Sequence, residues 1–208
     1  AYVKPRVNEV IYDGEHFFDG FKVDPEYTLA TLQAAIEGGA EMLVLCDTNG
    51  GVLPGRFREI TEDVVRSFDC SIGVHVHNDS GVAVANSIES VESGVVHIQG
   101  TCGGVGERCG NANLFTIIPN LVLKMNRPLS ITREKLKELT HVARYVSTVA
   151  NHHFSENSPY VGSQAFAHKG GMYVNSVIKK EGSYEHVSPG AVGNDRRFLV
   201  SELAGRSN

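Results

Sequence analysis

The sequence has no apolar stretch close to the ~20 residues that a membrane-spanning helix needs. Its first residues, AYVKPRVNEV, lack the apolar core of a signal peptide. There is no excess of basic residues either, because 19 Lys and Arg face 24 Asp and Glu and give a net charge of −5. These absences argue against a membrane span and against nucleic acid or anionic membranes as partners.

Cysteine is scarce and unpatterned. Cys46, Cys70, Cys102 and Cys109 form no C-x-x-C pair, and no other pattern indicates secretion. We therefore expect four reduced thiols and a cytoplasmic protein. With 208 residues, of which 41% are hydrophobic and 21% charged, the chain is long enough to bury a core and to form one domain with an appendage.

Four apolar runs, each followed by a helical pattern, dominate residues 1–125. The strands are expected to start near residues 7, 42, 72 and 95. Helices of about 12–15 residues between them predict right-handed βαβ units and a parallel sheet. Each run ends in glycine and polar residues, which is typical of a (β/α)8 TIM barrel with its active site in the loops after the strands. Four such units make half of a barrel in this α/β class.

The helices have recognisable limits. Asp24-Pro25 is a typical helix start, and Gly38-Gly39 a typical end. Further helices are expected around 60–68, over 82–93, and over 114–125 with a kink at Pro119. After residue 125 the repeat stops. We expect a mainly helical linker region over 126–208, with one long helix over 132–152 capped by Thr132 and a short one ending near Lys180.

Two histidines stand at the end of the third expected strand. His75 and His77 are two positions apart, so their side chains share a face of the strand and their Cα atoms lie about 6.6 Å apart. Two imidazoles can chelate one divalent cation from there. Taken alone, such a pair is more often one packed and one solvated histidine. Asn78 and Asp79 follow directly, and the glycine-rich turn at 103–111 is expected at the same end of the sheet, which favours a metal site.

Longer motifs resemble a known family. The segments HVHND, QGTCGGVGERCGNANL, AFAHKGGMYVNSVIK and VGNDRRFLVSELAGRSN are similar to those of the isopropylmalate, homocitrate and citramalate synthase family, most of all to its citramalate synthase branch. The resemblance implies an acyltransferase of amino-acid biosynthesis, acting as a homodimer. It would condense acetyl-CoA with a 2-oxo acid, here pyruvate, by a metal-assisted Claisen condensation and thioester hydrolysis. Isopropylmalate or homocitrate synthase activity is the alternative within the family.

The resemblance also implies roles for individual residues. His75, His77 and Asn111 would hold a divalent ion, and this mixed nitrogen and oxygen set leaves Mn, Zn, Co and Mg open. For Asn111 the alternative is capping of the next helix. Thr48 matches a threonine that binds the carboxylate of the 2-oxo acid, with helix capping as the alternative. Glu15 matches an acid/base carboxylate, with a solvated turn as the alternative.

Three further catalytic candidates lie in the linker region. The family carries a histidine and, further on, a tyrosine that reach over the barrel mouth, usually from the partner subunit. The histidine position falls on Tyr173 here. Either Tyr173 substitutes for it, or His168 takes over, or proton transfer is impaired. Tyr184 matches the tyrosine.

Two alternatives of other classes remain. A lyase of the hydroxymethylglutaryl-CoA type would share the barrel and metal site and would place a catalytic cysteine near Cys109. The synthases fit better with two segments of the turn, Glu107-Arg108 and Gly110-Asn111. We expect Glu107 and Arg108 to form an ion pair that stabilises the turn. The other alternative is an inactive metal-binding fragment. In the family, the first strand supplies an aspartate ligand, and a further domain binds an effector. Neither has a counterpart in this sequence, so the chain resembles the second half of a barrel with the linker region.

Overall fold

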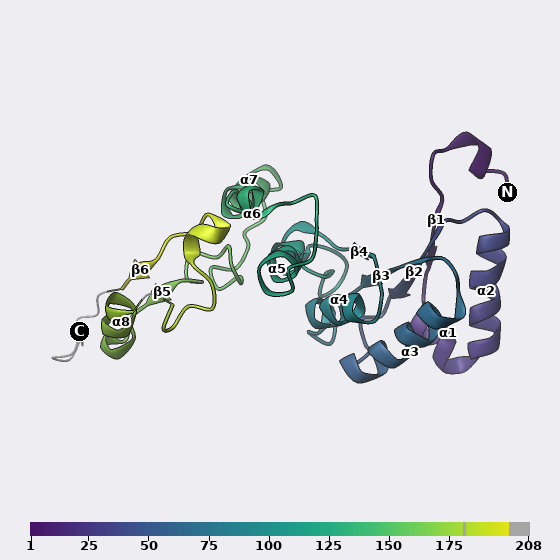
Figure 1. Cartoon of the computed structure of the whole chain (residues 1–208), viewed down its shortest axis with the longest axis horizontal. Coiled ribbons are helices and arrows are strands. Elements are labelled where there is room, and N and C mark those ends of the chain that lie inside the picture. Colours follow the sequence, from purple (N-terminus) through teal and green to yellow (C-terminus); the bar gives the residue numbers. More distant parts are fainter. Residues whose placement is uncertain (181, 200–208) are drawn as a thin grey trace. The chain divides into compact units, whose positions relative to one another are not determined.

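The computed structural model describes residues 1–180 and 182–199 (Figure 1). The chain forms two compact units, an N-terminal unit, Ala1–Ile117, and a C-terminal unit, Ile118–Asn208. The division falls within the segment 114–125, a few residues before the change of pattern in the sequence. Among the described residues, no helix has the length and hydropathy that crossing a bilayer requires.

The N-terminal unit is built on a four-stranded sheet in the order β1-β2-β3-β4. Every neighbouring pair is parallel, so the predicted parallel sheet is confirmed. The strands are β1 (Ile11–Gly14), β2 (Met42–Asp47), β3 (Ser71–Val76) and β4 (His97–Gln99). The first strand begins at Ile11, later than the expected start near residue 7, and a short 3-10 turn, η1 (Lys4–Arg6), precedes it.

Four helices follow the strands of this unit: α1 (Phe17–Val23), α2 (Pro25–Glu37), α3 (Pro54–Ser67) and α4 (Ala83–Glu92). The predicted start of α2 is confirmed, since the Asp24 carboxylate accepts the N–H of Tyr27 at 3.0 Å and proline occupies the first turn. The short helix α1 was not predicted. It buries three aromatic rings, Phe17, Phe18 and Phe21.

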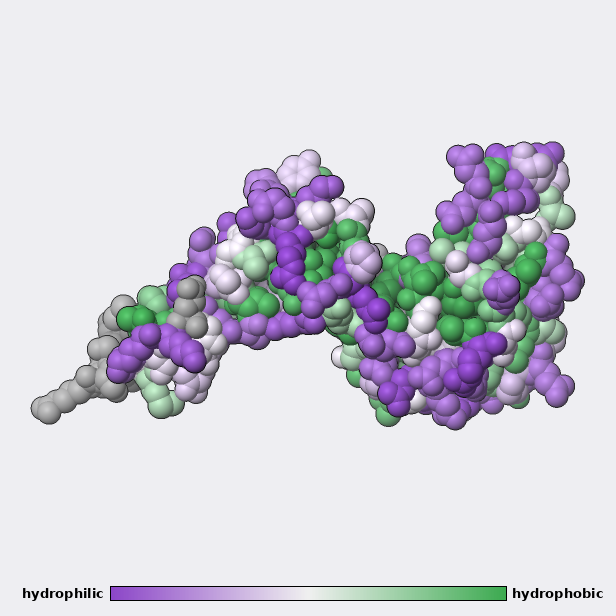
Figure 2. All heavy atoms as spheres, viewed as in Figure 1, coloured by the Kyte–Doolittle hydropathy of each residue, from purple (hydrophilic) through white to green (hydrophobic). Residues whose placement is uncertain are grey.

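One face of the sheet packs against these helices. The side chains on this face alternate with those on the other, and five of them are at most 2% exposed: Leu43, Leu45, Ile72, Val74 and Val76. Burying each contributes about 1.5–3 kcal/mol. Phe18 and Phe57 stack at 4.5 Å between ring centroids and join α1 to α3. In Figure 2, hydrophilic residues cover the outer side of α3, while hydrophobic residues gather over the strands.

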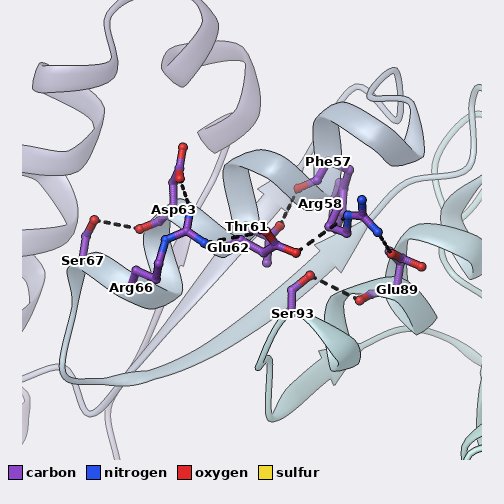
Figure 3. Close-up of polar contacts among 9 residues, drawn as sticks. All are labelled: Phe57, Arg58, Thr61, Glu62, Asp63, Arg66, Ser67, Glu89 and Ser93. Atoms are coloured by element: carbon purple, nitrogen blue, oxygen red, sulfur yellow. Dashed lines mark hydrogen bonds and ion pairs between the residues drawn. The ribbon is translucent and has the colours of Figure 1, made fainter.

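The polar contacts between α3 and α4 lie at the protein surface (Figure 3). The Arg58 guanidinium lies 3.0 Å from Glu89 of α4 and 3.7 Å from Glu62 of its own helix. These side chains are 38–56% exposed, so each pair contributes about 0–1 kcal/mol. The apolar core, rather than this surface network, therefore holds the helices against the sheet.

The prediction of one long helix over 132–152 is wrong in one respect, because the helix is interrupted. The structure has α6 (Arg133–Leu136), capped by Thr132 as expected, and α7 (Leu139–Val149). At the interruption, a Cβ on Gly193 would lie 1.9 Å from the carbonyl oxygen of Lys137. The backbone of a segment far along the chain therefore presses against the helix at this point.

Other elements of the C-terminal region agree with the sequence pattern. The α-helix α5 (Leu114–Pro119) ends at the predicted kink, and a π-helical turn, η3 (Asn120–Lys124), follows it. The helix α8 (Gly171–Lys179) ends close to the expected Lys180. Two further elements were not predicted. A small parallel pair joins β5 (Ala167–His168) to β6 (Arg197–Phe198), and a 3-10 turn, η4 (Pro189–Val192), precedes β6.

Candidate metal centre at the carboxyl end of the sheet

The face of the sheet opposite the helices carries the candidate metal ligands. Cys46, His75 and Gln99 are register partners on β2, β3 and β4, so their side chains lie in one row. His77 follows β3 directly, and the His75 and His77 ring centroids are 5.3 Å apart. The two histidines therefore share a face at the carboxyl end of a strand, as the sequence predicts.

Hydrogen bonds fix the orientation of the His75 ring. Its Nδ1 lies 2.8 Å from Oε1 of Gln99, whose Nε2 donates to Oδ1 of Asp13 at 3.0 Å. Its Nε2 lies 2.9 Å from Oδ1 of Asn111, whose Nδ2 donates to the carbonyl of Val105 at 3.1 Å. Because both amides have their N–H groups engaged elsewhere, each presents an oxygen to the imidazole.

This arrangement suits a bound cation. When His75 is neutral and donates its Nδ1–H to Gln99, the lone pairs of its Nε2 and of Asn111 Oδ1 point at each other, and a positive charge relieves that repulsion. His77 Nδ1 is buried and has no hydrogen-bond partner within the described residues. Such buried polar atoms are uncommon without a ligand, water or ion. Two imidazole nitrogens and an amide oxygen form a donor set that fits a divalent ion.

The electrostatics of His77 favour the neutral form that ligates metals. Burial lowers its pKa, and the nearby charges of His75 and Arg108 lower it further. Within the described ranges 1–180 and 182–199, no cluster of three or more His, Cys, Asp and Glu side chains has a metal-binding arrangement. The candidate set is therefore limited to two histidines and Asn111.

The glycine-rich turn after β4 delivers Asn111 to this site. Asn111 pairs with His77 in an isolated antiparallel bridge, and the N–H of Ala112 donates to the carbonyl of Val76 at 3.0 Å. Helix capping, the alternative for Asn111, falls to Asn113, whose side chain accepts the N–H of Phe115 at 2.9 Å. The Asn111 carboxamide is thus free to face His75.

Thr48 stands at the end of the neighbouring strand β2. Its hydroxyl accepts the N–H of His16 at 2.7 Å, at the start of α1, so it does not cap the helix that follows it. The turn is held by Asp47, whose buried carboxylate accepts the N–H groups of Gly51 and Val52 and whose pKa burial raises. Because the Thr48 hydroxyl accepts from the backbone, its own hydrogen is available to donate to a carboxylate.

Glu15 lies just beyond β1, at the same end of the sheet, and is exposed. Its backbone N–H donates to the carbonyl of Asp13 at 3.0 Å. Burial, followed by the charges of Asp13 and Glu15, raises the pKa of the Cys46 thiol to about 12. The two carboxylates are therefore close enough to influence the row of side chains that contains His75.

The ion pair expected between Glu107 and Arg108 is replaced by a different one. Arg108 donates from Nε and Nη2 to the two carboxylate oxygens of Asp79, at 2.8 and 3.0 Å, and from Nη2 to the carbonyl of Thr48 at 2.7 Å. Arg108 has a positive φ of 53°, which turns its side chain back across the site. One guanidinium thus connects the loops that follow β2, β3 and β4.

The C-terminal unit holds the remaining candidates in two clusters. Tyr173 and Tyr184 contact each other edge to face, 4.6 Å between centroids, and are 44% and 47% exposed. His168 lies apart from them in an ion pair, its Nε2 3.1 Å from Glu185. Arg196 binds the same carboxylate through two hydrogen bonds of 2.7 Å. The structure thus brings the two tyrosines together, while the imidazole of His168 is engaged with Glu185.

Comparison with family models gives a direct result. Residues 2–146 match the model described as HMGL-like, and residues 160–208 match the one described as homocitrate synthase post-HMGL domain-like. The chain belongs to the HMGL-like family. The resemblance and the TIM-barrel type of fold that the sequence predicts are confirmed by these matches.

Relatives of this HMGL-like chain include (R)-citramalate synthases. That of Aquifex aeolicus is 53% identical over 208 residues, and that of Synechocystis sp. is 51% identical over 216. Both alignments cover 100% of this chain and 39% of the relative. Among solved structures, an HMG-CoA lyase of Bacillus subtilis superposes with a TM-score of 0.53 at 25% identity, over 62% of this chain and 44% of that one.

Asp79 is noted from the sequence only as part of the polar turn after His77, and two further residues with contacts at the candidate site were not predicted: Asp13 and Gln99. Each stands at the end of a strand among other polar residues, where the pattern indicates only a turn. The sequence did hold one signal for Gln99, the two-residue period of side chains along a strand. Gln99 lies just before the glycine-rich turn, as His75 lies just before the polar turn of the neighbouring strand. Recognising their contacts would also have required the strand register.

Proposed function

We propose that this HMGL-like chain is part of an acyltransferase that condenses acetyl-CoA with pyruvate to give citramalate. The observation that supports it is the 53% and 51% identity with two (R)-citramalate synthases over the whole of this chain. The chain spans 39% of the length of these relatives, so the activity of the whole protein is inferred from this part of it.

His75, His77 and Asn111 are the proposed ligands of a divalent ion, with Mn, Zn, Co and Mg as candidates. Bound there, such an ion would supply Lewis acidity toward the ketone of the 2-oxo acid. The chain's own task is to orient both imidazoles. Two observations support this assignment: the buried Nδ1 of His77, which has no hydrogen-bond partner in the described part of the chain, and the converging atoms of His75 and Asn111.

Thr48 is the proposed contact for the carboxylate of the 2-oxo acid. Its hydroxyl is anchored by the N–H of His16, and its carbonyl by Arg108, which leaves the hydroxyl hydrogen in a fixed position for donation. Glu15 is the proposed acid/base group that takes a proton from the methyl carbon of acetyl-CoA. Its exposure beside the row of metal-site residues supports this role.

For the C-terminal unit, we propose that Tyr173, rather than His168, stands in for the family's histidine, together with Tyr184. Tyr173 is exposed and touches Tyr184, whereas the His168 side chain is 10% exposed and committed to Glu185. In the proposed homodimer, the partner copy supplies the two tyrosines. All four cysteines are free thiols, which agrees with the proposed cytoplasmic location.

Release of the CoA thiol from acetyl-CoA tests the activity, with Mn²⁺ present and pyruvate, 2-oxoisovalerate and 2-oxoglutarate compared. We expect pyruvate to be preferred. A second readout, broadening of the pyruvate methyl proton signal by Mn²⁺ in the presence of the chain, does not depend on turnover. Thr48→Val should weaken pyruvate binding and leave Mn²⁺ binding unchanged. Preference for another 2-oxo acid, or intact Mn²⁺ binding by His75→Ala, would contradict the proposal.

A further inference from the structure

Three side chains from three strands form a hydrogen-bonded chain on the open face of the sheet. Asp13 of β1 accepts from Gln99 of β4 at 3.0 Å, and Gln99 in turn faces Nδ1 of His75 of β3 at 2.8 Å. β1 and β4 are the outer strands of the sheet, with two strands between them. Since neighbouring strands lie about 4.8 Å apart, the Asp13–Gln99 bond requires a curled sheet whose inward side chains converge.

The chain of bonds has a fixed direction. An ionised carboxylate only accepts hydrogen bonds, so Asp13 must face the NH₂ group of Gln99. The carbonyl oxygen of Gln99 then faces His75, and an oxygen in that position requires a hydrogen on Nδ1. In a neutral imidazole this leaves the lone pair on Nε2, the atom that lies beside Asn111. The carboxylate on one edge strand thereby selects the tautomer of a histidine two strands away.

We propose that Gln99 is a positioning residue of the metal centre, which holds His75 in the Nδ1–H tautomer, and that Asp13 sets the orientation of Gln99. This inference rests on the proposed function, because His75 is a ligand only if the metal site is correct. Metal-binding histidines commonly donate their second N–H to a carboxylate, carbonyl or water. Here the neutral amide of Gln99 lies between the Asp13 carboxylate and the His75 ring. The carboxylate therefore fixes the orientation of the amide, and through it that of the ring, without placing a negative charge beside the ring.

Two substitutions separate the parts of this relay. Gln99→Met preserves the length of the side chain and removes both hydrogen bonds. Asp13→Asn preserves an acceptor for Gln99 but adds a donor, so that the Gln99 amide can turn over and present its NH₂ group to His75. Gln33→Met is the matched control, because Gln33 is exposed on α2 and its side chain bonds Glu37 of its own helix.

The first measurement is ¹⁵N NMR of the imidazole nitrogens in the metal-free chain at about pH 8, above the usual imidazole pKa of about 6.5. His75→Ala identifies the His75 signals. We expect the Nδ1–H pattern in the unmodified chain and in Gln33→Met, and a shift toward the Nε2–H form in Gln99→Met and Asp13→Asn. The second measurement is Zn²⁺ affinity in competition with a chromophoric chelator. Gln99→Met should lose about 10–100-fold in affinity, and Gln33→Met nothing.

The outcomes are distinguishable. An unchanged tautomer in Gln99→Met overturns the inference, whatever happens to Zn²⁺ affinity, because loss of affinity alone would reflect a displaced ligand. A changed tautomer with unchanged Zn²⁺ affinity also overturns it. If the unmodified chain binds no Zn²⁺ through His75 and His77, the proposed metal site fails, and the NMR result still decides whether Gln99 sets the tautomer.

Discussion

A side chain at position 106 would collide with the carboxamide of Asn111. A Cβ built on Gly106 lies 2.0 Å from Nδ2 of Asn111, although Gly106 itself has no positive φ. Glycine is needed here for space, because the turn passes directly over a proposed metal ligand.

Gly106→Ala should therefore displace Asn111 and weaken binding of Mn²⁺ or Zn²⁺ by about 10–100-fold, as measured by competition with a chelator. The thermal stability should change little, because the turn is on the surface. Gly55→Ala is the control, since a Cβ there meets nothing within 4 Å. Equal metal affinity in the two variants would show that Asn111 is not a ligand.

Arg108→Gln should weaken binding of the 2-oxo acid more than binding of the metal. The guanidinium binds the carbonyl of Thr48 and the carboxylate of Asp79, rather than a proposed ligand. Misplacing Thr48 by about 1 Å can cost between tenfold and a hundredfold in substrate use. Titration of pyruvate into the Mn²⁺-loaded chain measures the effect. Arg56→Gln, which removes an exposed pair with Glu59 on α3, serves as control and should change nothing.

The four thiols should differ widely in reactivity. Burial raises the pKa of Cys46 to about 12, so only about one molecule in 10,000 carries its thiolate at pH 8. Cys109 is exposed and should react first with iodoacetamide, followed by the half-buried Cys70 and Cys102. Mass spectrometry of timed samples gives the order. Labelling of Cys46 in the folded chain as fast as Cys109 would show that β2 is more accessible than the structure indicates.

Cys109→Ser separates the synthase from the lyase alternative. A lyase with a catalytic cysteine in this turn should lose nearly all activity, whereas the proposed synthase should keep most of it. The sulfur of Cys109 is exposed, and the turn reaches the metal site through its neighbours Arg108 and Asn111. CoA release with pyruvate, compared with cleavage of a 3-hydroxyacyl-CoA, measures both activities in the same preparation.

Acid should destabilise the C-terminal unit through Glu185. The Arg196 guanidinium, with His168 as a further partner, holds the pKa of Glu185 below its ordinary value of 4.5. Its stabilising effect is thus complete above pH 4.5 and is lost as the pH falls through the lowered pKa. Near pH 7, Glu185→Gln should cost about 1.5–3 kcal/mol, the range for hydrogen bonds to charged groups, because the Arg196 side chain is 26% exposed and water can solvate it.

The comparison is made by denaturant titration followed by NMR signals of the C-terminal unit. The difference in unfolding free energy between the unmodified chain and Glu185→Gln should shrink between pH 5 and pH 3. A difference that stays constant over this range would show that folding does not lower the pKa of Glu185.

Local patterns gave correct predictions where short-range physics decides the structure. The strand period of two placed His75 and His77 on one face, and Asp24-Pro25 started a helix at the expected residue. The interruption between α6 and α7 could not be predicted, because it lies where Gly193 from a distant segment presses on the backbone of Lys137. Arg108 was assigned to its sequence neighbour Glu107, whereas its positive φ turns it toward Asp79 on another loop.

The bond between Asp13 and Gln99 has a consequence for how the N-terminal unit folds. It joins positions 86 residues apart on the two outer strands, and it needs both inner strands in place before it can close. Contacts of such long range form late, because the loop entropy must be overcome first. We therefore expect the tautomer of His75 to be set late in folding, so that loss of the Asp13–Gln99 bond would raise the unfolding rate and leave the folding rate nearly unchanged.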